Sequence, residues 1–85
     1  MENTSNTRVA VISIIVEEPE RVPEINKILH DAADSIIGRM GLPYREKNIS
    51  IISVVADAQQ NEISNISGRL GRLSGVTVKT AYSKQ

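Results

Sequence analysis

Four stretches of the chain carry apolar patterns that predict strands. Arg8–Val16, "RVAVISIIV", is apolar at most odd and even positions, which is typical of a strand buried on both faces. Residues 49–57, "ISIISVVAD", repeat this pattern. Val76–Tyr82, "VTVKTAY", alternates in the way a strand with one exposed face does. A fourth strand is predicted over residues 36–45, "IIGRMGLPYR", where β-forming ends surround two glycines.

Two other segments show the spacing of three and four residues that defines one face of a helix. The first begins near Pro23, because proline fits a first helical turn, where its missing N–H costs nothing. Its apolar face consists of Ile25, Ile28, Leu29, Ala32, Ala33 and Ile36. For the second helix, Asp57 with Gln60 resembles a capping box, and Ser74–Gly75 marks the end. Its narrower stripe consists of Ile63, Ile66, Leu70 and Leu73.

The predicted order is strand, helix, strand, strand, helix, strand. Right-handed crossovers then favour an α+β, ferredoxin-like βαββαβ sandwich, with an antiparallel sheet of order 4-1-3-2 and both helices on one face. The two strands that this order places in the centre are the two that are apolar on both faces, while the edges carry Pro43 and Lys79. We therefore predict one domain over residues 8–84, preceded by a polar, disordered tail over residues 1–7.

A sheet with helices on one face leaves its other face open. We assign Ile12, Ile14, Ile52 and Val54 to the helix side. The open side receives Val11, Ser13, Ile15, Ile51, Ser53 and Val55. Exposed aliphatic residues in one patch favour self-association, and a chain of this size buries only about 60–65% of its unfolded surface. The six open-side residues are therefore our candidates for the interface of a homodimer or homotetramer.

Composition excludes several partners and chemistries. Ten basic and ten acidic residues give a formal net charge of zero, which argues against direct binding to nucleic acid or to an anionic membrane. The chain has two aromatic residues, Tyr44 and Tyr82, neither on a predicted central strand, so the base-stacking platform of RNA-recognition domains is excluded. The absence of cysteine excludes disulfides and thiolate metal sites and fits a cytoplasmic location. The N-terminus does not resemble a secretory signal.

Candidate chemistry is sparse. The single histidine, His30, has Asp31 and Asp34 nearby, but one imidazole makes a poor transition-metal site. No serine has a visible base and orienting group, so we predict a non-enzyme with no catalytic residue, no metal site and no cofactor. The glycine-rich "GRLGRLSG", residues 68–75, lies at the end of a predicted helix, where the helix dipole does not favour a phosphate. We expect Gly68 and Gly71 to allow close packing of the helices.

Three stretches together identify a family. "RVAVISIIVE", "IIGRMGLPYREKNISIISVV" and "GRLGRLSGVTVKTAYSK" resemble the small bacterial proteins of the iron-only hydrogenase system regulator family, from Arg8 to Lys84. The resemblance implies a ferredoxin-like fold related to ACT domains and to the C-terminal regulatory domain of nickel-responsive repressors. It also implies dimers or tetramers, and a connection with [FeFe]-hydrogenase expression or maturation in anaerobic bacteria. It implies no mechanism, because the metal ligands and the DNA-binding arm of the nickel-responsive repressors have no counterpart here.

Two functions remain open. The first is an oligomeric regulator that senses a small ligand, and the second is a module that docks on a hydrogenase maturation or transcription factor through its sheet face or edge. The loop after the first strand, Glu17–Glu20, corresponds to the ligand loop of ACT domains but lacks their typical aspartate and glycine. The candidate ligand-binding residues are Glu18, Arg39, Tyr44 and Arg45.

Overall fold

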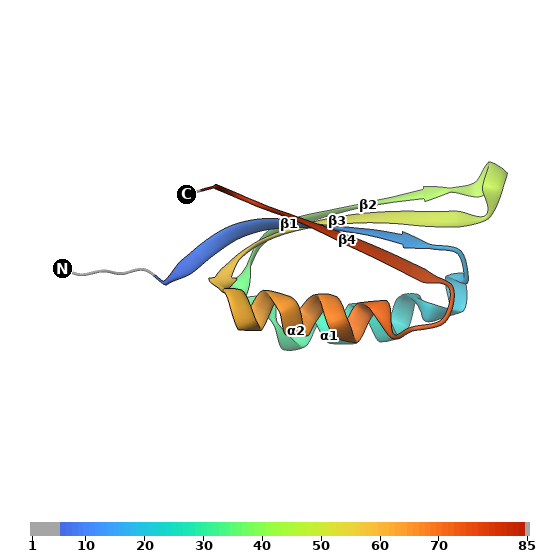
Figure 1. The fold of residues 1–85 in the computed structure, drawn as a ribbon. Coiled ribbons are helices and arrows are strands. Elements are labelled where there is room, and N and C mark those ends of the chain that lie inside the picture. Colours follow the sequence, from blue (N-terminus) through green and yellow to red (C-terminus); the bar gives the residue numbers. More distant parts are fainter. Residues whose placement is uncertain (1–5, 85) are drawn as a thin grey trace.

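The predicted order of elements is confirmed by a computed structural model, which describes residues 6–84 (Figure 1). The strands and α-helices are β1 (Thr7–Val16), α1 (Val22–Asp31), β2 (Ile36–Tyr44), β3 (Ile49–Gln59), α2 (Gln60–Gly71) and β4 (Val76–Tyr82). Three short 3-10 turns connect them, η1 (Pro19–Arg21), η2 (Ala33–Ser35) and η3 (Arg45–Lys47). Among residues 6–84, neither α-helix is long and apolar enough to cross a membrane.

The four strands form one antiparallel sheet in the order β2-β3-β1-β4, so the predicted α+β, ferredoxin-like fold is confirmed. The helices α1 and α2 contact each other and lie beneath the same face of the sheet (Figure 1). Across the sheet, Ile14 of β1 lies opposite Ile52 of β3 on one side and Val78 of β4 on the other. The long central pair β1–β3 therefore supplies most of the surface on which the helices pack.

The core lies between the sheet and the helices. Ile12, Ile14, Ile52 and Val54 are buried, as the assignment to the helix side requires. Ile25, Ile28 and Leu29 of α1 and Ile63, Ile66 and Leu70 of α2 are buried against them. The helix periodicity arises because only residues three and four apart face the sheet, and those positions carry the aliphatic side chains.

The prediction that Ile36 belongs to the first helix is wrong. α1 ends at Asp31, the backbone of Ala32 leaves helical geometry at φ −106° and ψ 19°, and η2 turns the chain toward the sheet. Ile36 is the first residue of β2, opposite Ala56, and it packs against the core from the strand. The helical spacing led to this error because a strand residue that faces the helices must also have an apolar side chain.

The capping box predicted at Asp57 and Gln60 is also wrong. β3 continues to Gln59, and Asp57 lies within it opposite Val9, while α2 begins at Gln60 with no side-chain cap. Pairing with β1 decides the outcome, because Ala56 and Ala58 are buried in a ladder that extends to the pair Thr7–Gln59. β1 thus begins at Thr7, and residues 1–5 of the expected tail lie outside the described part of the chain.

The end of α2 differs from the prediction in two ways. The helix ends at Gly71, and Leu73 packs against the core from the turn that follows rather than from the helix. A Cβ at Gly71 would meet nothing within 4 Å, and one at Gly68 would meet only the Arg72 guanidinium at 3.9 Å. Close helix packing therefore does not explain these glycines. At the surface of the two helices, Arg69 Nη2 of α2 lies 3.3 Å from Asp31 Oδ2 of α1.

Candidate functional site

The open face of the sheet carries most of the large apolar side chains that the described residues leave exposed. Strand register places Leu42, Ile51 and Ile15 in one row across β2, β3 and β1, with Ser13 directly opposite Ser53 in the next row. Met40 is 66% exposed and Leu42 is 55% exposed. We define the open-face patch as Val9, Val11, Ile15, Met40, Leu42, Tyr44 and Ile51, all of which are exposed.

All six residues proposed as interface candidates lie on this face. Val11, Ser13, Ile15 and Ile51 are exposed, whereas Ser53 and Val55 are half-buried in the middle of the sheet. Sequence reasoning missed Met40 and Leu42, because the glycines and Pro43 of β2 disguised an alternation that places every second residue on the open face. The available signal was an alternation along this strand, in which Met40, Leu42 and Tyr44 take turns with Arg39, Gly41 and Pro43.

Strand β2 is exposed on both of its faces from Ile37 to Tyr44. It is an edge strand, and a bulge between Ile36 and Gly38 shifts its register against β3. Because the helices cover mainly the other strands, the helix side of β2 overhangs a groove along α1. The groove consists of two hollows of about 420 and 290 Å³ that share Asn26 and Arg39.

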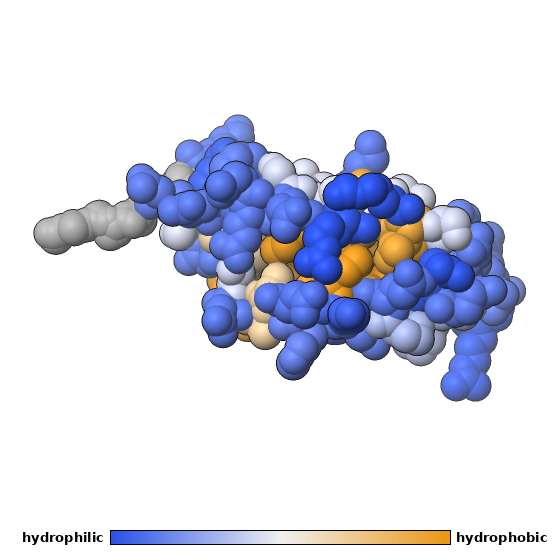
Figure 2. Space-filling view, turned by 90° about the horizontal axis from the view of Figure 1, so that it is seen from below, coloured by the Kyte–Doolittle hydropathy of each residue, from blue (hydrophilic) through white to orange (hydrophobic). Residues whose placement is uncertain are grey.

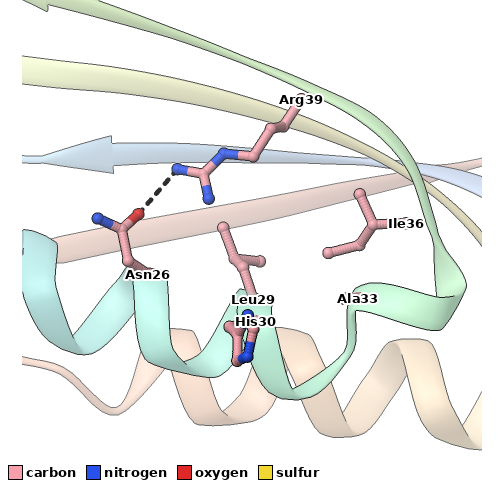
Figure 3. Close-up of a pocket in the computed structure, with 6 residues that line it drawn as sticks. All are labelled: Asn26, Leu29, His30, Ala33, Ile36 and Arg39. Carbon is pink, nitrogen blue, oxygen red and sulfur yellow. Dashed lines mark hydrogen bonds between the residues drawn. The ribbon is translucent and has the colours of Figure 1, made fainter.

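Arg39 spans the groove from the strand to the helix. Its Nη2 donates a hydrogen bond of 2.9 Å to Oδ1 of Asn26 on α1 (Figure 3). The larger hollow is completed by Leu29, His30, Ala33 and Ile36, and Leu29 and Ile36 point into the space beneath Arg39 (Figure 3). The smaller hollow is completed by Val22, Gly41, Leu42, Pro43, Ser50 and Ile52.

The surface on the helix side is mainly hydrophilic. Seen from this side, hydrophilic residues surround an area of apolar residues (Figure 2). Neither hollow is lined by an aspartate or a glutamate. Arg39 forms no ion pair within residues 6–84, since its hydrogen-bond partner is a neutral carboxamide. The groove therefore combines an apolar floor with one positive charge that no nearby carboxylate neutralises.

The candidate Glu18 is held in a structural role. Its Oε1 accepts a hydrogen bond of 3.0 Å from the hydroxyl of Ser74 and lies 3.8 Å from Nε of Arg21. The backbone reinforces this junction, because the N–H of Glu17 donates to the carbonyl of Gly75 at 2.7 Å. Gly75 has a φ of +70°, and a Cβ there would lie 2.5 Å from Cγ of Glu18. Glu18 thus fastens the end of β1 to the start of β4.

The structure does not bring the four candidate ligand residues together. Arg39 lines the groove on the helix side, whereas Tyr44 belongs to the open-face patch and Arg45 is exposed in η3 at the tip of the β2–β3 hairpin. His30 is exposed at the margin of the larger hollow, and no group of three or more His, Asp or Glu within residues 6–84 could hold a metal ion. Asn26 was missed, because it lies outside the apolar face predicted for the first helix.

These features define a class of protein, namely a ferredoxin-like domain whose sheet has an uncovered apolar face. The family model described as "TM1266-like: Iron-only hydrogenase system regulator, putative" matches residues 8–80. The chain therefore belongs to this family, and the resemblance read from its three stretches is confirmed.

Solved structures agree with this assignment. Protein TM1266 from Thermotoga maritima is 35% identical, with a TM-score of 0.88 over 92% of this chain and 99% of that one. A formyltetrahydrofolate deformylase from Pseudomonas putida KT2440 is 8% identical, with a TM-score of 0.64 over 91% of this chain and 29% of that one, so this likeness extends to the fold alone. No curated protein matches the sequence.

Proposed function

We propose that this protein is a non-enzymatic regulator of the iron-only hydrogenase system that assembles with copies of itself and senses a small ligand. Family membership supplies the connection with the hydrogenase system. The observation that carries the rest is the open-face patch, because seven large apolar side chains share one face of a small domain without a cover. Patches of this kind mark interaction surfaces in small proteins.

A second copy of the chain is the occupant that this face fits best. A two-fold arrangement lets one surface serve both protomers, so the apolar row through Leu42, Ile51 and Ile15 would meet its own equivalent. Lys79 is the only charged residue in the neighbouring row, at its outer end on β4 opposite Ser13. A dry centre with charge kept to the edge is typical of homodimer interfaces.

The side chains give no support to an enzyme. The hydroxyl groups of Ser35, Ser67 and Ser74 hydrogen bond to Glu62, Thr80 and Glu18 respectively, at separate places. His30 is not a partner in any of the side-chain hydrogen bonds found within residues 6–84. A nucleophile with its base is therefore not assembled among these residues, and binding rather than catalysis is the proposed activity.

Sedimentation velocity tests the assembly. We expect a dimer or tetramer at micromolar concentration, and we expect Ile15→Lys to dissociate it, because burying an unpaired ammonium group in an apolar interface is strongly unfavourable. Ser64→Lys, at an exposed position on α2, is the matched control and should leave the assembly intact. A monomeric wild-type protein would reject the proposal, and so would equal effects of the two lysines.

A docking module is the second candidate, favoured by the free edge of β2. An edge strand exposed on both faces can accept a strand from a hydrogenase maturation or transcription factor. A pull-down from an anaerobic lysate would then recover that factor with the wild-type chain. A variant with Met40→Pro, which removes a backbone donor at the middle of β2, should lose it. Recovery of the chain alone would count against docking.

A further inference from the structure

The groove between α1 and β2 exists because the edge strand is placed beyond the reach of the helix. α1 ends at Asp31, and η2 turns the chain so that β2 runs back above α1 (Figure 3). Beyond Ile36, which packs on the core, the helix-side residues of β2 are Arg39, Gly41 and Pro43, and they leave the space below open. The larger hollow, of about 420 Å³, lies within the size range of small-ligand sites.

The polar groups of the larger hollow suit a single negative charge. Arg39 uses one Nη2 donor on Asn26, which leaves most of its five N–H donors for a ligand. Because Oδ1 of Asn26 accepts this bond, the carboxamide nitrogen remains as a further donor. A guanidinium matches the planar geometry of a carboxylate, which it can bind through two parallel hydrogen bonds.

Apart from the exposed imidazole of His30 at its margin, the remaining surface of the hollow is apolar. Leu29 is buried at its floor, Ile36 points into it from the start of β2, and Ala33 leaves its mouth wide (Figure 3). A dianionic phosphate would exceed the single charge of Arg39, and the ammonium group of an amino acid would find no carboxylate among the lining residues. The preferred ligand has one carboxylate and a compact, uncharged apolar body.

We propose that this hollow binds a small aliphatic carboxylate, with its carboxylate on Arg39 and Asn26 and its apolar body against Leu29 and Ile36. The site deepens the proposed ligand-sensing function and rests on it for its regulatory meaning. β2 carries the groove on one face and Met40, Leu42 and Tyr44 of the open-face patch on the other. A ligand that holds β2 against α1 therefore changes how firmly β2 presents that patch to a second copy.

Proton–nitrogen correlation spectra of the intact protein test the site directly. Isocaproate is the probe, and its neutral amide and leucine share the apolar body but change the charge. We expect isocaproate to shift the Asn26 side-chain amide and the Arg39 Nε–H with saturation. The amide and leucine should bind about tenfold more weakly or worse, because a charge-assisted hydrogen bond or the balance of charge is lost. Absence of saturable shifts with isocaproate overturns the proposal.

Two pairs of variants test whether isocaproate binding depends on this hollow rather than on charge or side-chain size elsewhere on the surface. Arg39→Gln should weaken isocaproate binding about tenfold or more, whereas Arg45→Gln removes the same charge from the neighbouring η3 and should not. Ala33→Leu should block the larger hollow, whereas Gly41→Val fills the smaller one, where a Cβ meets nothing within 4 Å, and should leave binding intact. Equal losses within either pair overturn the assignment. Thermal unfolding of each variant confirms that it is folded.

A second measurement distinguishes failure of the carboxylate site from failure of the proposed regulatory function. Sedimentation of the same samples, with and without isocaproate, reports assembly independently of the spectra. An oligomer without saturable binding refutes the carboxylate site and leaves the assembly standing. Saturable binding by a monomer supports the site and refutes its regulatory meaning.

Discussion

Gly75→Ala is expected to destabilise the protein through two effects that can be separated. The first is conformational, because Gly75 has a φ of +70°, where a residue with a side chain costs about 1–2 kcal/mol. The second is steric, since the new Cβ would lie 2.5, 2.7 and 2.9 Å from Cγ, Cδ and Cβ of Glu18. Relieving such an overlap costs about 1–3 kcal/mol. The sum is about 2–5 kcal/mol.

Urea unfolding followed by circular dichroism measures this cost, with all variants at one protein concentration so that assembly affects them equally. Glu18→Gly removes all three of these atoms, so Gly75→Ala made in that background should cost only about 1–2 kcal/mol. The coupling energy of the cycle would then be about 1–3 kcal/mol. In a domain of this size the single substitution lowers Tm by about 8 °C or more. A cost below about 0.5 kcal/mol, or an equal cost in both backgrounds, would refute the reasoning.

Two further substitutions test the packing and the surface. Ile14→Ala should cost about 2–5 kcal/mol in urea unfolding because Ile14 is fully buried. Ile15→Ala at the next position, measured at a protein concentration low enough to leave the chain monomeric, should cost much less. Similar costs under that condition would mean that the two faces are wrongly assigned. Asp31→Asn breaks the exposed pair with Arg69, for which we expect a cost of less than about 1 kcal/mol that falls further as salt screens the pair. A larger loss would show that this contact holds the helices together.

The central strands and the sheet order could be predicted because both depend on apolar periodicity. Arg8–Val16 and residues 49–57 are apolar on two faces, and the structure places β1 and β3 in the middle of the sheet. The expected burial on both faces is wrong for the domain alone, because one face packs on the core and the other belongs to the exposed open-face patch. The errors lie where a long-range contact overrides a local signal. Asp57 has the sequence of a helix cap, but its backbone belongs to a ladder with β1 that no local pattern records.

The groove could not be predicted for a related reason. Arg39 was a candidate because we expected it to be an exposed group, but its partner Asn26 lies 13 positions earlier, in α1. Whether these two side chains meet depends on the angle at which β2 leaves η2, which is a property of the assembled sheet. Glu18 is the opposite case. As a charged loop residue it suggested a ligand-binding role, but its side chain accepts a hydrogen bond from Ser74 and lies against the turn at Gly75.

Because β2 is exposed on both of its faces, its local stability should be lower than that of the rest of the domain. Amides that pair between β1 and β3 lie in the middle of the sheet, where exchange with solvent requires global unfolding. In contrast, β2 can open while the buried cluster stays intact, because that cluster includes only Ile36 from this strand. Amide hydrogen exchange should therefore show one fast strand beside a slow domain. The energy needed to detach β2 is small, so contacts with a ligand or another chain can change its state without unfolding the rest.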